Sequence, residues 1–126
     1  MATPTEMLNS YGRAVERIKA RHSKLSFRQQ RKNLGKAGDH TAQVKMDYLE
    51  WTFHRRVRLS ELWPRTDGLE RISQMDALEE ARVLDSATIR GTVWVTPRLC
   101  NGLLGKFLAG KITAAEAVKQ EEASCG

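Results

Sequence analysis

Six basic side chains recur at helical spacing near the start of the chain. Successive members are 4, 4, 3, 4 and 3 residues apart, in the order Arg13, Arg17, Arg21, Lys24, Arg28 and Arg31. On a helix this spacing places them within about 80° of one another. Like charges one turn apart repel, so the row destabilises the helix unless something anionic lies against it. A nucleic-acid backbone supplies such anions, and arginine binds phosphate through paired hydrogen bonds. The row therefore predicts contact with nucleic acid.

Five further cations extend this set of candidate nucleic-acid-binding residues. Lys32 and Lys36 follow the row in a segment whose glycines predict a loop. Arg55, Arg56 and Arg58 stand toward the end of a second predicted helix. An alternative explanation exists for these three arginines, because cations near a helix C-terminus are stabilised by the helix macrodipole.

The charge is distributed unevenly along the 126 residues, which carry a net charge of +6. Residues 1–65 hold fourteen basic and six acidic side chains, whereas residues 66–126 hold seven and nine. We expect a single domain, residues 1–126, with a basic half (1–65) and an acidic half (66–126). Such asymmetry draws polyanions to one end of a molecule. The alternative is a solvated basic surface that has no partner.

Residues for catalysis or metal binding do not form a recognisable pattern. The sequence lacks the glycine-rich phosphate loops, the zinc-protease motif and the nucleophile elbow. Its three histidines are widely separated, and Cys100 and Cys125 do not form a Cys-x-x-Cys pair. We therefore expect no enzyme activity, no catalytic residues, no metal site and no cofactor.

The same composition indicates where the protein acts. Two cysteines form no disulfide framework, which favours a reducing compartment and a cytoplasmic location. No apolar run approaches the ~18 residues of a membrane span. The N-terminal residues show no basic stretch followed by an apolar block, so we expect no secretory signal.

The first helix that must position the basic row has clear sequence signals. Thr3, Pro4 and Glu6 form a capping-box pattern with proline at the first helical position. An apolar stripe at spacings of three and four follows, made of Met7, Leu8, Tyr11, Ala14, Val15, Ile18 and Leu25. A second capping-box pattern at Ser26 predicts that the helix stops near Leu25 and restarts. In that case Arg28 and Arg31 lie on a different axis.

A second helix is predicted over residues 39–62, with apolar residues on two opposite sides. One stripe is Val44, Tyr48, Trp51, Leu59 and Leu62, and the other is Met46, Leu49, Phe53 and Val57. Either the helix is sandwiched inside the fold, or another protein covers one stripe. Tyr48, Trp51, Phe53 and Trp94 are the candidate partner-binding residues, although aromatic residues in such stripes are more often core.

The remaining segments complete a mostly α fold. We expect a third helix over residues 69–84, or a shorter one starting near 73–76, and a β segment at 87–95. That segment forms a hairpin around Arg90 and Gly91 or pairs with another subunit. A fourth helix is predicted from 96–97 to Gly110, and a short last one from the Thr113 capping box to about 122. The predicted fold is four to five helices in one compact bundle-like domain, with at most one short β hairpin near 87–95.

These patterns favour a non-catalytic nucleic-acid-binding accessory or regulatory protein of the kind that phages and plasmids encode. It would contact the phosphate backbone of DNA or RNA, because no complete base-reading element is visible. The alternative is an adaptor or inhibitor that docks on another protein or nucleoprotein complex without reading nucleic acid. We also expect self-association as a homodimer, since one helix stripe and the β segment have no certain partner in the chain.

Overall fold

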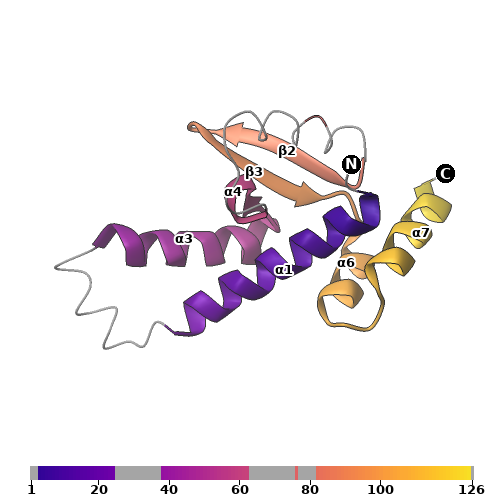
Figure 1. The fold of residues 1–126 in the computed structure, drawn as a ribbon, viewed down its shortest axis with the longest axis horizontal. Helices are drawn as coiled ribbons and strands as arrows, with labels where there is room; N and C mark the ends of the chain where they lie inside the picture. The colour runs from indigo at the N-terminus through magenta and orange to yellow at the C-terminus, as the bar shows by residue number, and fades with distance from the viewer. Residues whose placement is uncertain (1–2, 25–37, 63–75, 77–81, 126) are drawn as a thin grey trace.

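The chain is mostly helical in the computed structural model, which describes residues 3–24, 38–62, 76 and 82–125 (Figure 1). These described residues include five helices and three strands. In chain order they are α1 (Pro4–Ser23), α3 (Gly38–His54), β1 (Val57–Arg58), α4 (Leu59–Leu62), β2 (Leu84–Ile89), β3 (Thr92–Pro97), α6 (Asn101–Leu108) and α7 (Ala114–Cys125). The predicted loop with Lys32 and Lys36, the second capping box and most of the predicted third helix lie outside the described residues.

Helix α1 begins as its sequence predicts. The Thr3 hydroxyl accepts a hydrogen bond from the Glu6 backbone N–H at 3.2 Å, and the Glu6 carboxylate accepts one from the Thr3 N–H at 3.4 Å. The described part of the predicted stripe is buried: Met7, Leu8, Tyr11, Ala14, Val15 and Ile18 are at most 1% exposed. Its last predicted member, Leu25, lies outside the described residues. The helix ends at Ser23, with Lys24 as its C-cap, just before the predicted interruption near Leu25.

The second predicted helix is shorter than residues 39–62, so that prediction is wrong at its C-terminal end. Helix α3 stops at His54, and Arg55 takes the left-handed backbone conformation with φ of 58°. The Tyr11 hydroxyl donates a hydrogen bond to the Arg55 carbonyl at 3.0 Å, which holds the break in place. The chain then pairs with β3, where Val57 is opposite Val95, before the short helix α4. Hydrogen bonds to β3 satisfy the backbone N–H and C=O groups that a continued helix would otherwise have satisfied.

The three strands form an antiparallel sheet in the order β1-β3-β2. Strands β2 and β3 are joined by Arg90 and Gly91, with φ of 51° and 80°, as a two-residue hairpin turn with two left-handed positions requires. The predicted hairpin is confirmed, but its strands extend beyond 87–95 and β1 adds a third strand. Because Leu84 pairs with Pro97, the third predicted helix cannot reach residue 84.

The C-terminal part of the described chain is a helical hairpin that packs on α1. The prediction of a helix from 96–97 is wrong, because Thr96 and Pro97 end strand β3 and α6 begins at Asn101. After α6 the Gly110 N–H bonds the Phe107 carbonyl at 3.1 Å and the Lys111 N–H bonds the Lys106 carbonyl at 2.9 Å. These two bonds form a Schellman motif, with Gly110 at φ of 78°.

Helix α7 starts with the predicted cap, since the Thr113 hydroxyl accepts a hydrogen bond from the Glu116 N–H at 3.2 Å. It contacts both α1 and α6 (Figure 1). Ala114 and Ala117 are buried, and Ile112 and Val118 pack partly buried against the core. The α6–α7 hairpin therefore closes one side of α1.

Helix α1 lies at the centre of this arrangement and contacts α3, α4, α7 and β1 (Figure 1). The buried side chains form one cluster, in which Ile18 of α1, Trp51 of α3, Val95 of β3 and Leu104 of α6 all take part. None of the described helices is both long and apolar enough to cross a membrane. The core thus fixes the orientation of α1 and leaves its other side for polar residues.

Candidate nucleic-acid interface

Four cations of the basic row lie on the described part of α1 and at its C-cap: Arg13, Arg17, Arg21 and Lys24. Arg28, Arg31, Lys32 and Lys36 fall outside the described residues. We call the four described residues the α1 basic row. They divide into two pairs with different surroundings.

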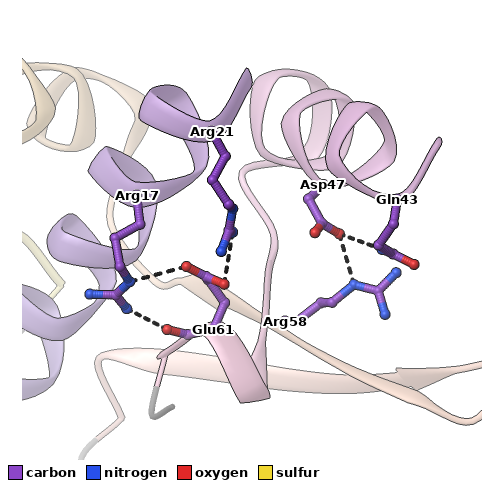
Figure 2. Close-up of polar contacts among 6 residues, drawn as sticks. All are labelled: Arg17, Arg21, Gln43, Asp47, Arg58 and Glu61. Atoms are coloured by element: carbon purple, nitrogen blue, oxygen red, sulfur yellow. Dashed lines mark hydrogen bonds and ion pairs between the residues drawn. The ribbon is translucent and has the colours of Figure 1, made fainter. Parts of the chain in front are cut away.

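Arg17 and Arg21 share one carboxylate, that of Glu61 in α4 (Figure 2). Arg17 Nε lies 3.1 Å from Glu61 Oε1, and Arg21 Nη2 lies 2.8 Å from Glu61 Oε2. Arg17 also donates to the Glu61 backbone carbonyl. An anion does lie against the row, as the repulsion within it requires. It comes from the protein itself.

Packing of α4 places this carboxylate. Leu59 and Leu62 are 3% and 2% exposed and anchor the short helix in the core. Glu61, between them in sequence, keeps only 16% of its side chain exposed and faces α1. The role of Glu61 was not predictable from the sequence, because its contact with Arg17 joins residues 44 positions apart.

The two arginines remain accessible despite this pairing. Each keeps 40% of its side chain exposed. A guanidinium has five N–H donors, and two for Arg17 and one for Arg21 are used in the contacts with Glu61. One carboxylate also neutralises only one of the two positive charges. The pair therefore keeps donors and net positive charge for a second anion.

Arg13 and Lys24 are the outward pair of the row. Both are exposed, and neither forms an ion pair with the acidic residues that the structure describes. Among the described residues Arg13 donates one side-chain hydrogen bond, to the hydroxyl of Ser10 on its own helix at 3.1 Å. Within this part of the chain, neither cation would give up an ion pair in order to meet an external anion.

A cleft of about 560 Å³ borders the row, between α1 and the end of α6. Its polar wall includes Arg13, Glu16 and Arg17, and its apolar wall includes Phe107 and Leu108. Gly12 allows the close approach of the two walls, because a Cβ there would lie 3.0 Å from Cζ of Phe107. The cleft thus adds an amphipathic surface beside the cations.

The predicted second basic cluster is tied into the protein. Arg56 pairs with Glu50 at 2.8 Å, and Arg58 pairs with Asp47 at 2.7 Å. Asp47 also accepts from Gln43 at 2.8 Å, as Figure 2 shows. The Arg58 guanidinium lies 4.9 Å from the centre of the Trp94 ring. These contacts connect α3 to β1 and β3.

Arg55, the third arginine of that cluster, is exposed and forms no ion pair within the described residues. Its guanidinium lies 5.7 Å from the centre of the Trp51 ring. The Arg55 carbonyl holds the hydroxyl of Tyr11, and burial raises the pKa of Tyr11 above its usual value although the charge of Arg55 opposes this. Tyr11 is therefore a neutral hydrogen-bond donor in the core.

The four aromatic candidates for partner binding separate into core and surface. Trp51 and Trp94 are 8% and 7% exposed, so their rings offer little surface to a base or a protein. Tyr48 is half-buried and stacks on His22, with ring centres 3.8 Å apart. Of the four, Phe53 alone is largely exposed, at 72%.

Met46 and Leu49, which were not among the candidates, are exposed together with Phe53. Their place on the second stripe was the signal that could have identified them.

Among the residues that the structure describes, no group of three histidine, cysteine or acidic side chains could hold a metal ion.

Comparison of the chain with protein-family models, with curated proteins and with solved structures finds no significant match.

Proposed function

We propose that the protein binds nucleic acid without catalysis, through the phosphate backbone, with the α1 basic row as its contact surface. One observation carries this proposal. The four cations of the α1 basic row lie along one side of a single helix, and Glu61 is the one described carboxylate that pairs with any of these four. The sequence continues this basic character through Arg28, Arg31, Lys32 and Lys36.

Glu61 has a supporting role in this proposal. It reduces the repulsion between Arg17 and Arg21 in the free protein, and it holds both guanidinium groups in place. Side chains that are already ordered lose less conformational entropy when they bind a ligand. Phosphates then meet two oriented guanidinium groups, flanked by the outward pair Arg13 and Lys24.

Contacts of this kind position a protein on nucleic acid without reading its sequence. We therefore propose an accessory or regulatory protein, of the type encoded by phages or plasmids, that acts in the cytoplasm as a single bundle-like domain. Arg55 is exposed just after α3 but lies over Trp51, away from the α1 basic row, whereas Arg56 and Arg58 support the fold.

The proposal is tested by fluorescence anisotropy with labelled duplex DNA, duplex RNA and single strands, each at two salt concentrations. The informative variant is Arg13→Glu with Lys24→Glu, since neither residue forms an internal ion pair in the described part of the chain. We expect it to lower affinity for the preferred nucleic acid by at least about tenfold, because two phosphate contacts become repulsive.

The matched control is Lys111→Glu with Lys119→Glu, which makes the same change in charge on exposed residues of the α6–α7 hairpin. It should lower affinity by no more than about threefold, through the change in long-range field alone. Equal losses in the two variants, or no binding by the wild-type protein at low salt, would refute the α1 basic row as the contact surface.

A second candidate function, docking on another protein as an adaptor or inhibitor, is favoured by one observation. Met46, Leu49 and Phe53 are exposed on the same side of α3. Burial of such an apolar surface depends little on salt, whereas phosphate binding depends on it steeply. Salt dependence of complex formation therefore separates the two functions.

A further inference from the structure

Helix α3 has a second apolar side that the described chain leaves uncovered. Met46, Leu49 and Phe53 are 56%, 38% and 72% exposed, and Ala42 is exposed one turn before them. We call these four residues the α3 outer face. At 100° per residue they project within about 60° of one another. Val44 and Trp51, which are buried, lie on the opposite side of the helix.

The spacing of the α3 outer face is that of a coiled-coil seam. Its members follow one another at intervals of four, three and four residues. This is the alternation of the two apolar positions of a heptad, through which one helix packs lengthwise against another. A binding groove for a small molecule does not require this pattern.

The charges beside the seam indicate what packs there. Lys45 flanks it on one side and Glu50 on the other, five residues later. In a parallel pair of identical helices, these two flanking positions face each other across the seam. Lys45 of each copy then lies opposite Glu50 of the other copy. An antiparallel pair would instead bring each flank against the same flank of the second copy.

The Glu50 carboxylate has an oxygen available for this contact. Arg56 bonds Oε2 of Glu50 through both Nε and Nη2, at 2.9 Å and 2.8 Å. Oε1 makes no hydrogen bond or ion pair among the described residues. Lys45 is exposed and likewise forms no ion pair within them. The interchain contact would therefore leave the bonds between Arg56 and Glu50 intact.

We propose that the α3 outer face is the interface of a homodimer, in which the two α3 helices pack in parallel about a two-fold axis. The occupant of the face is a second copy of this chain. The complementary charges of Lys45 and Glu50 across the seam are the reason for proposing both a second copy as the occupant and the parallel orientation. This proposal is independent of nucleic-acid binding, because none of the residues of the α3 outer face belongs to the α1 basic row.

The area of the face sets the expected strength. A buried aromatic side chain contributes about 150–250 Å², so Phe53, Met46 and Leu49 together offer on the order of 300 Å². A standard interface buries about 800 Å² on each partner. The dimer must therefore recruit polar surface around the seam, and we expect a dissociation constant of about 10–100 μM.

Sedimentation velocity over a wide range of concentration tests the interface, with Phe53→Ser as the disrupting variant. The wild-type protein should pass from a 14.3 kDa monomer to a dimer as concentration rises. Phe53→Ser should weaken association at least tenfold. The control Ile89→Ser removes an apolar side chain on β2 with 40% exposure and should leave association unchanged.

Disulfide trapping tests the orientation in a protein that carries Cys100→Ser and Cys125→Ser. A parallel seam places Ala42 next to Ala42 of the second copy, so Ala42→Cys alone should form a crosslinked dimer under mild oxidation. Lys45→Glu should weaken association, because it sets two carboxylates against each other. Lys119→Glu, with the same change in charge on α7, should not.

Three results would overturn the proposal. One is a protein that stays monomeric at every concentration. The proposal then fails whatever Phe53→Ser does to the melting temperature: a lower value would mean that the chain's own residues cover the face, and an unchanged value would mean that nothing covers it. Another is dimerisation that Phe53→Ser does not weaken. The third is crosslinking that appears only when Ala42→Cys is mixed with Phe53→Cys, as an antiparallel pair would give.

Discussion

Helices α1 and α3 pack against each other (Figure 1). Their outer sides nevertheless differ in chemistry. The buried residues of α1 form one continuous stripe, and the opposite side carries charged residues. Helix α3 buries one stripe and exposes another, which is apolar. Two helices that share a core therefore expose different surfaces, one basic and one apolar.

The two helices also differ in how completely their charged residues are paired within the protein. Arg17 and Arg21 on α1 converge on a single carboxylate and keep excess positive charge. On α3, Asp47 and Glu50 each have an arginine from the β1 region, which leaves little excess charge. Positive potential at a protein surface requires cations that exceed their internal partners. By this criterion α1, rather than α3, carries the excess positive charge that the proposed contact with a polyanion requires.

The largest predicted effect tests the difference in burial between the two helices. Ile18→Ala in α1 should lower the free energy of unfolding by about 2–5 kcal/mol, because Ile18 is 1% exposed and its loss leaves a cavity. Leu49→Ala on the α3 outer face should cost less than about 1 kcal/mol, since solvent already reaches that side chain. Urea denaturation at a concentration that keeps the protein monomeric measures both. Similar losses would mean that Leu49 is covered within the monomer.

A smaller effect is predicted for the inward pair of the α1 basic row. Arg17→Glu with Arg21→Glu should destabilise the protein by about 2–3 kcal/mol, because it places three carboxylates together around the position of Glu61. Loss of nucleic-acid binding in this variant would therefore be hard to separate from loss of fold. Thermal unfolding followed by circular dichroism measures the destabilisation.

The outward pair supplies the matched comparison for that variant. Arg13→Glu with Lys24→Glu makes the same change in charge and should alter stability by less than about 0.5 kcal/mol. Adding Glu61→Arg to the inward double variant should recover part of the lost stability, since one cation again lies between two carboxylates. Equal stability of the inward and outward variants would contradict the role of Glu61.

An effect of the size of one hydrogen bond is predicted for the contact between Tyr11 and the break after α3. Tyr11→Phe should cost about 1 kcal/mol at neutral pH, through loss of the hydrogen bond to the Arg55 carbonyl. Burial raises the pKa of Tyr11, so the folded protein keeps a proton that the unfolded chain releases above about pH 10. Wild-type stability should thus fall as pH rises past this value, and its advantage over Tyr11→Phe should shrink. Urea denaturation at pH 7 and near pH 11 compares the two proteins, and a constant difference would contradict the buried tyrosine.

Local signals explain which parts of the fold were predictable from sequence. The Thr3 cap, the stripe of α1, the turn at Arg90 and Gly91 and the cap at Thr113 each depend on residues close together in sequence. All four are present in the structure. The mostly helical character follows from such patterns as well.

Contacts between distant residues account for the elements that sequence misassigned. The helical pattern continues through Val57, but pairing with Val95 and the hydrogen bond from Tyr11 turn this segment into a strand. Thr96 and Pro97 resemble a helix start, yet Pro97 pairs with Leu84. In both cases tertiary pairing outweighs a weak local preference.

The candidate site was predictable only in part for the same reason. Its cations follow from their spacing on one helix, whereas the position of Glu61 depends on the packing of α4. The two stripes of α3 were visible in the sequence. Which of them is exposed depends on where α1 and the sheet pack.

The salt dependence of nucleic-acid binding is the sharpest test of whether the α1 basic row contacts phosphates. The α1 basic row together with Arg28 and Arg31, which continue it in the sequence, makes six cations. Six cations on a phosphate backbone predict a slope of roughly −4 to −6 in a plot of log affinity against log salt concentration. In the Arg13→Glu and Lys24→Glu variant, the loss of two contacts should reduce the steepness by about 2. We expect this pair of slopes from anisotropy measurements on the preferred nucleic acid. A wild-type slope near zero, or the same slope in both proteins, would contradict it.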